Sequence, residues 1–243
     1  MQFRTPRSAS RQKTTNIVYT DTTDIPLHSR SKRTLWQVAA VAAIFVAVIS
    51  IDQWSKFWVK THMYLHERIR VADWFYIYFT ENNGMAFGME FFDKIFLTLG
   101  RLFLVGLVLW YLIRCMKRGV KWGYLICLVL IMAGAFGNII DCTFYGLVFN
   151  ESLPYQLAER VPFGTGYSSW FYGRVVDMLY FPLVEWNWPS WLPWLGGDHF
   201  IFFSPIFNVA DTSISCGVIA LILFYRKMLS EPSASNARQA ADQ

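Results

Sequence analysis

Residues 207–225 read FNVADTSISCGVIALILFY, which joins an acidic motif to an apolar run. The run Ile214–Tyr225 is long enough to form part of a membrane span, and Asp211 lies just before it. A second aspartate, Asp177, ends the short motif Val-Val-Asp. A carboxylate in or beside a membrane segment is energetically costly, so such residues usually mark a function. The two aspartates are interpreted as a pair that shares one proton and activates water, as in aspartic proteases.

The composition indicates a membrane protein rather than a soluble domain. Of 243 residues, 54% are apolar and only 16% are charged, and the 11 Trp and 12 Tyr suit two membrane interfaces. The net charge of +5 could indicate nucleic-acid binding. However, the basic residues cluster beside apolar runs and no nucleic-acid-binding motif is present, so no nucleic-acid partner is expected. The four cysteines show no paired spacing and are interpreted as small hydrophobic residues.

Four apolar stretches are expected to cross the membrane as helices, each close to the roughly 20 residues that a bilayer requires. For the first, a cleaved signal peptide is the alternative, but no small-residue cleavage site follows and Trp54 to Val59 prolong the helix. Before it, residues 1–34 form a basic tail that we expect to be disordered. The predicted spans are 35–59, 91–113, 122–140 and 209–225 within a four-helix membrane domain 35–227, and residues 228–243 form a second tail that we expect to be disordered.

Lysines and arginines set the expected orientation in the membrane. They concentrate in the N-terminal tail, in the connection 114–121 and at the end of the fourth span. Both termini are therefore expected in the cytoplasm, with residues 60–90 and 141–206 on the extracytoplasmic side. In the first of these outer segments, residues 74–79 alternate with period two and predict a strand on the membrane surface. The predicted fold is an all-α membrane protein, a four-transmembrane-helix bundle with a small extracytoplasmic β-rich segment and a long outer loop.

Five polar clusters lie on the outer side of this arrangement. Asp52 and Lys56 are one helical turn apart and could pair, and Asn138 and Asp141 share a helix face. A helix cap would explain any single cluster, but five clusters at one membrane level favour an active site. The clusters are Asp52 with Lys56, Asn82 with Gly84, Asn138 with Asp141, Asp177, and Asn208 with Asp211.

The segments that carry these clusters resemble the lipoprotein signal peptidases, the signal peptidase II family. They occur in family order and extend over about residues 35–225, which makes the resemblance specific. The matching segments are DQWSK at 52–56, NNGMAFG at 82–88, GAFGNIID at 134–141, VVD at 175–177 and FNVADTS at 207–213.

The resemblance implies a hydrolase of the bacterial cytoplasmic (inner) membrane, an aspartic endopeptidase with its active site on the extracytoplasmic side. Such an enzyme removes signal peptides from diacylglyceryl-modified prolipoproteins by cutting N-terminal to the lipidated cysteine. These precursors and membrane lipids are the expected partners, a monomer is expected, and no cofactor or metal is needed. Asp177 and Asp211 would be the catalytic residues. Substrate-binding or supporting positions would be Asp52, Lys56, Asn82, Gly84, Asn138, Asp141 and Asn208.

Three features depart from the family pattern. Ala133 stands where a glycine is usual, and Cys142 stands where an arginine commonly follows the aspartate. The outer segments 142–174 and 178–206 are also longer than is typical. These departures affect the surroundings of Asp141 and the substrate entrance, and they leave both aspartates of the pair in place.

Two other functions compete with this interpretation. A small polytopic transporter or membrane scaffold could also carry an acidic polar site. A translocation path needs polar groups through the full bilayer depth, whereas nothing ionisable lies between Asp211 and Arg226. A different intramembrane aspartyl protease is the second alternative, but its Gly-x-Gly-Asp element is absent from the sequence.

Overall fold

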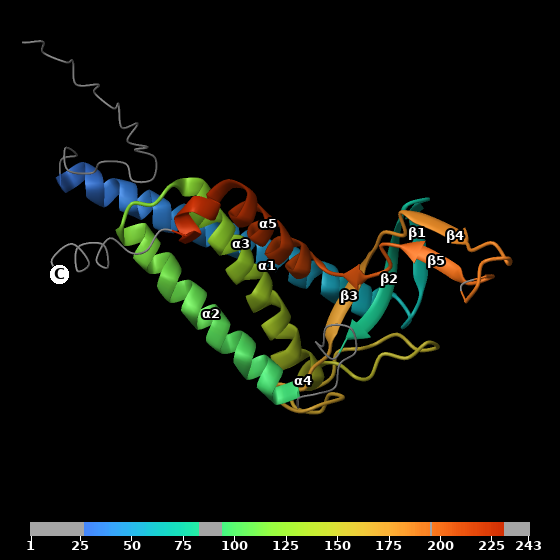
Figure 1. Cartoon of the computed structure of the whole chain (residues 1–243). Coiled ribbons are helices and arrows are strands. Elements are labelled where there is room, and N and C mark those ends of the chain that lie inside the picture. The colour runs from blue at the N-terminus through green and yellow to red at the C-terminus, as the bar shows by residue number, and fades with distance from the viewer. Residues whose placement is uncertain (1–26, 83–93, 195, 231–243) are drawn as a thin grey trace, which may run out of the picture.

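The computed structural model describes residues 27–82, 94–194 and 196–230. Its four long helices lie together, and the strands gather beyond the C-terminal end of the first helix (Figure 1). Each of the four helices is long and apolar enough to cross a membrane. They are α1 (Leu27–His62), α2 (Lys94–Lys117), α3 (Trp122–Ile140) and α5 (Val209–Ser230).

The helix bounds differ from the predicted spans mainly at the ends. Helix α1 begins at Leu27, inside the segment predicted to be a disordered tail, and continues to His62. The third predicted span coincides with α3, whereas α2 and α5 continue past their predicted ends to Lys117 and Ser230. Each of these extensions begins with an arginine after the apolar run, so a criterion based on uninterrupted apolar length stops before it. Residues 91–93, at the predicted start of the second span, lie outside the described residues.

Helix α3 is the central element of the bundle, because it packs against α1, α2 and α5. Two glycines allow the close approach of its neighbours. A Cβ atom on Gly134 would lie 2.3 Å from the carbonyl oxygen of Ala210, at the start of α5. A Cβ atom on Gly137 would lie 2.7 Å from a carboxylate oxygen of Asp52, on α1. Small residues at a helix interface bring backbones close together, which here brings the polar ends of three helices together.

Beyond the C-terminal end of α1 the described chain forms antiparallel sheets, so the predicted β-rich segment is present and includes strands from both long connections. The predicted strand at 74–79 lies largely in β2, and β2 pairs with β3 from the second outer segment. Because this pairing joins segments far apart in sequence, local patterns do not reveal it. One antiparallel sheet has the order β1 (Arg68–Ala72), β2 (Phe75–Asn82), β3 (Val175–Tyr180) and β6 (Ile206–Phe207), and a hairpin joins β4 (Val184–Asn187) to β5 (His199–Phe202).

A hydrophobic core joins the sheet to the membrane helices. Val176 and Met178 of β3 are buried against Val59 and Met63, near the end of α1. Helix α3 also continues toward the sheet, as a π-helical turn at Asp141–Tyr145 followed by α4 (Gly146–Val148). The position of β3 is therefore set by α1 and by the extension of α3.

Candidate active site

The first turn of α5 places Asp211 by a reciprocal cap. The Oδ1 atom of Asn208 accepts a hydrogen bond from the Asp211 backbone N–H at 2.9 Å, and the Asp211 carboxylate accepts one from the Asn208 N–H at 3.4 Å. This is a capping box with an aspartate at the third helical position. The cap explains the three-residue spacing, and the helix N-terminus favours a negative charge on Asp211. The side chain also reaches outside its own helix, because Asp211 Oδ1 accepts a hydrogen bond from Asn138 at 2.8 Å.

Asp177 lies in the middle of β3, and its residue is only 3% exposed. Its Oδ1 atom accepts a hydrogen bond from the Asn208 side-chain amide at 2.7 Å. Asn82, at the end of β2, also forms a hydrogen bond with the Asp177 carboxyl group. Asn208 therefore contacts both aspartates, one through its side chain and the other through the helix cap.

Near this pair, the fully buried ammonium group of Lys56 joins α1 to the C-terminal end of α3. It forms ion pairs with Asp52 at 2.9 Å and with Asp141 at 2.8 Å. It also donates to the Oδ1 atom of Asn138 at 2.8 Å. The sequence predicted the pairing of Asp52 with Lys56, and the structure confirms it; Asp141 is a second ionic partner of the same lysine.

The two carboxylates around Lys56 each hold a backbone amide next to a residue of the pair. Asp52 accepts a hydrogen bond from the Ala210 N–H at 2.8 Å, immediately before Asp211. Asp141 accepts one from the Val176 N–H at 3.3 Å, immediately before Asp177. One buried lysine with its two carboxylates thus fixes the backbone at both aspartates.

The structure brings together eight of the nine residues that the sequence selected. The ninth, Gly84, lies outside the described residues. Gln53 stood in a quoted motif without an assigned role, yet its side-chain amide donates to Asp141 at 2.8 Å and to the Gly137 carbonyl at 3.2 Å. Its position next to Asp52, with a polar side chain inside an apolar helix, was a signal that could have identified it.

Cys142 is fully buried, where the family pattern commonly has an arginine. Arg101 of α2 approaches it from the neighbouring helix, with its Nη1 atom 3.5 Å from the Cys142 sulfur. A guanidinium group thus lies beside this position, although it comes from another helix. Within the part of the chain that the structure describes, no three His, Cys, Asp or Glu side chains are placed to hold a metal ion.

Burial, and after it repulsion from the Asp211 charge, together raise the pKa of Asp177 from 3.8 to about 7. The nearby Lys56 charge and the hydrogen bonds from Asn208 and Asn82 oppose this shift. Near neutral pH, Asp177 therefore carries a proton for part of the time. The arrangement provides one carboxyl group that can donate a proton and another, at a helix N-terminus, that can accept one.

Comparison with known proteins agrees with this geometry. The family model described as signal peptidase (SPase) II matches residues 44–227, more than half of the chain. The chain belongs to the signal peptidase II family. A lipoprotein signal peptidase of Porphyromonas gingivalis is 49% identical over 195 residues, which cover 80% of this chain and 86% of the relative. One from Amoebophilus asiaticus is 33% identical over 209 residues, with 82% and 81% coverage.

A solved structure also matches the fold of this signal peptidase II. It is a bacterial membrane enzyme determined by the in meso method at 2.3 Å resolution, with a TM-score of 0.52 and 23% sequence identity. The match covers 81% of this chain and 93% of that chain. The family, the relatives and the four apolar helices together identify a multi-pass membrane protease of lipoprotein processing.

We expect the protonation of Asp177 to be directly measurable. In infrared spectra, the carboxyl band that is lost in Asp177→Asn can be assigned to Asp177. In the unaltered protein this band should titrate with a midpoint near pH 7. Asp211→Asn should lower this midpoint because it removes the repelling charge, whereas Asp198→Asn on the exposed hairpin should leave it unchanged. Because the pKa in the folded state lies above the unfolded value, protonation stabilises the fold; this contribution is complete below about pH 4 and is lost as the pH rises through about 7. A midpoint near 4 in the unaltered protein would contradict the assignment.

Proposed function

We propose that this signal peptidase II is an aspartic endopeptidase that removes signal peptides from diacylglyceryl-modified prolipoproteins. It cuts the peptide bond N-terminal to the lipidated cysteine. The observation that carries the proposal is the convergence of Asp177 and Asp211 on Asn208 at one end of a membrane helix bundle. Two carboxyl groups from different elements, held by one amide, form the arrangement that activates water in aspartic proteases.

The two aspartates divide the acid and base roles. Asp211 accepts hydrogen bonds from the Asn138 side chain and the Asn208 N–H, which orient its carboxylate, and it takes a proton from the attacking water. Asp177 is buried and protonated near neutral pH, so it donates its proton to the carbonyl oxygen of the scissile bond. The water oxygen bonds to the carbonyl carbon and forms a tetrahedral species with two hydroxyl groups. The proton gained by Asp211 then passes to the leaving amine, the carbon–nitrogen bond breaks, and one hydroxyl proton returns to Asp177 as the new carboxyl group forms.

The surrounding residues keep this pair in position and hold the peptide. Asn138 donates to Asp211 and accepts from Lys56, so the orientation of its amide is determined on both sides. Asn82 lies at the edge where β2 meets β3, and its side chain is half-buried. It is therefore available to bind the peptide backbone of the substrate as well as Asp177.

The proposed location follows from the charge distribution. We place the protein in the bacterial inner membrane with both termini in the cytoplasm and the aspartates on the extracytoplasmic side. The signal helix and acyl chains of the precursor are apolar and reach the site laterally from the bilayer. The enzyme acts as a monomer, since all the catalytic groups come from one chain.

Replacement of either aspartate by asparagine should nearly abolish cleavage, by on the order of 10⁴-fold, because the pair acts as a unit. The double replacement should cost little more than either single one. Purified variants would be incubated with a diacylglyceryl-modified precursor, and release of its signal peptide would be followed. Asp198→Asn is the matched control and should cleave normally. Near-normal turnover in either single variant would exclude that residue from catalysis.

The lipid on the substrate should raise turnover more than affinity. Its acyl chains already lie in a bilayer or micelle, so moving them onto the protein gains little of the approximately 0.8 kcal/mol per CH₂ that burial from water provides. The lipid therefore acts mainly by positioning the peptide bond at the two aspartates. Lipidated and unmodified precursors would be compared in the same detergent by kcat and KM. Equal cleavage of both would reject lipoprotein specificity and leave a general membrane aspartic protease.

A further inference from the structure

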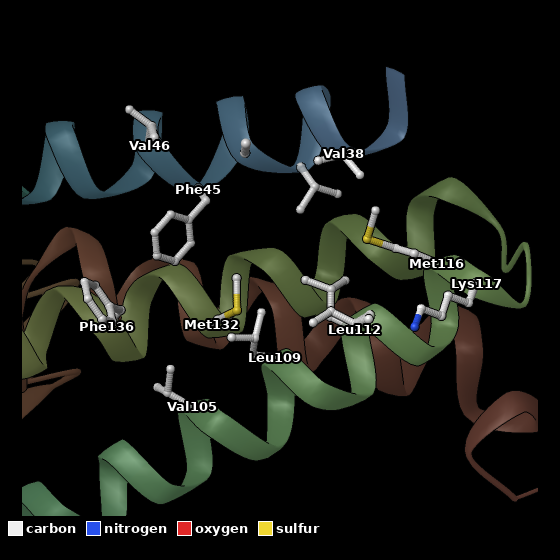
Figure 2. Close-up of a pocket in the computed structure, with 13 residues that line it drawn as sticks. Val38, Phe45, Val46, Val105, Leu109, Leu112, Met116, Lys117, Met132 and Phe136 are labelled. Atoms are coloured by element: carbon white, nitrogen blue, oxygen red, sulfur yellow. The ribbon is translucent and has the colours of Figure 1, made fainter. Parts of the chain in front are cut away.

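An apolar groove separates α1 from α2, and α3 forms its floor (Figure 2). Its volume is about 550 Å³. It extends along residues 38–46 of α1 and 105–117 of α2, so it lies in the half of the bundle away from Asp52 and the aspartates. Phe45 and Phe136 lie together in it, with ring centroids 5.6 Å apart. The groove is therefore a separate feature from the active site.

The groove has one charged residue, and it stands at one end. Every lining residue is apolar except Lys117, which is the last residue of α2 and has an exposed side chain (Figure 2). Arg114, Arg118 and Lys121 lie close to it along the chain, so this end of the bundle is positively charged. An occupant that is apolar along its length and negative at one end would match the groove.

The groove is large enough for one acyl chain of a lipid. At the usual helical rise, residues 38–46 of α1 extend over roughly 13 Å, so a membrane span of roughly 20 residues and 30 Å would lie only partly in the groove. If a methylene takes about the volume of a liquid-water molecule, about 30 Å³, the groove holds roughly 18 methylenes. The volume therefore fits one acyl chain of a lipid.

The positive charge at the Lys117 end of the groove distinguishes between a signal peptide and a lipid as the occupant. A signal peptide carries its positive charges at the end that precedes its apolar segment, and Lys117 would repel that end. An anionic phosphate group would instead be attracted to it. We propose that the groove binds one acyl chain of an anionic phospholipid, with the lipid phosphate at Lys117. This is a structural lipid site on the protein and is independent of the peptide bond that the enzyme cuts.

The test uses full-length protein in nanodiscs with phosphatidylglycerol that carries a photoactivatable group on one acyl chain. Labelled peptides should come from the lining of the groove. Ala42→Phe should remove most of this labelling because the ring fills the groove, whereas Ala43→Phe, an exposed position outside the lining, should not. Lys117→Gln should reduce the preference for phosphatidylglycerol over phosphatidylcholine about fivefold, and Arg160→Gln, at an exposed position in the loop after α4, should leave it unchanged.

Three results would overturn this lipid site. One is labelling spread evenly over all the lipid-facing helices, and another is equal labelling in the two alanine variants. The third is cross-linking of the groove to the signal peptide of a bound precursor, which would make it a substrate site. Thermal unfolding of each variant in the same nanodiscs confirms that it is folded, so a loss of labelling cannot come from unfolding.

A second inference rests on a different observation, a buried ion cluster beyond the active site. Lys60 is fully buried, one turn after Lys56 on α1, and its ammonium group pairs with Glu81 of β2. The same group donates to Ser152 at 2.8 Å, and Ser152 donates to Glu81 at 2.8 Å. Arg174, the residue before β3, reaches Glu81 at 3.3 Å. The cluster thus connects α1 to β2 and to the residue before β3, the strand that carries Asp177.

We infer that Lys60 and Glu81 are positioning residues for Asp177, an inference that rests on the proposed function. In the sheet register, Glu81 lies opposite Val176, and Thr80 lies opposite Asp177. A shift of β2 relative to α1 would therefore be transmitted directly to Asp177. Displacements of about 1 Å at a catalytic group can cost about 10²-fold in rate.

Lys60→Met should lower kcat about 10²-fold with little change in KM, and Lys60→Arg should restore much of the loss because it keeps the charge. The infrared midpoint of Asp177 should fall in Lys60→Met and in Glu81→Gln, because the carboxyl group moves away from Asp211 and toward water. An unchanged midpoint and kcat, in variants that remain folded, would leave the cluster only a structural role. The midpoint does not depend on cleavage, so failure of this inference is distinguishable from failure of the proposed function.

Discussion

The site depends on an ammonium group that is completely removed from water. Transferring Lys56 out of water costs several kcal/mol, and only its two carboxylates and one amide oxygen offset that cost. The same carboxylates hold the backbone at Ala210 and Val176. Asp141 Oδ2 both pairs with Lys56 and accepts the hydrogen bond from the Val176 N–H, so the loss of this carboxylate would remove a partner of the buried charge and a support of the backbone together. The ion cluster therefore ties the stability of this region to the geometry of the two aspartates.

Helix α1 extends this constraint to the end of the helix bundle that carries the sheet. Asp52, Lys56 and Lys60 are four residues apart and lie along one helix face. The first holds the start of α5, the second holds α3, and the third holds the strands. A single rigid helix therefore serves as the common reference for three elements that are distant in sequence. The hydrophobic contacts of Val59 and Met63 with β3 reinforce the same alignment.

The sequence predicted the features that depend on local patterns. Apolar length identified the four helices, and four-residue spacing identified the pairing of Asp52 with Lys56. Sequence reasoning failed where distant segments meet: the pairing of Asp177 in β3 with Thr80 in β2 has no local signal. Gln53 and Lys60 were missed for a related reason. Their partners, Asp141 and Glu81, lie on other elements, and a polar residue near a helix end is usually explained by exposure to water.

The reciprocal cap at the start of the last long helix also has a consequence for biogenesis. Asp211 belongs to α5, whereas Asp177 and Asn82 belong to segments made earlier in synthesis. Asn208, which joins the two aspartates, is held by the same first turn of α5. The pair of aspartates therefore cannot assemble until α5 has entered the membrane and its first turn has formed. A nascent chain with three inserted helices lacks half of the pair, so the proposed mechanism implies that peptidase activity begins only once α5 is in place.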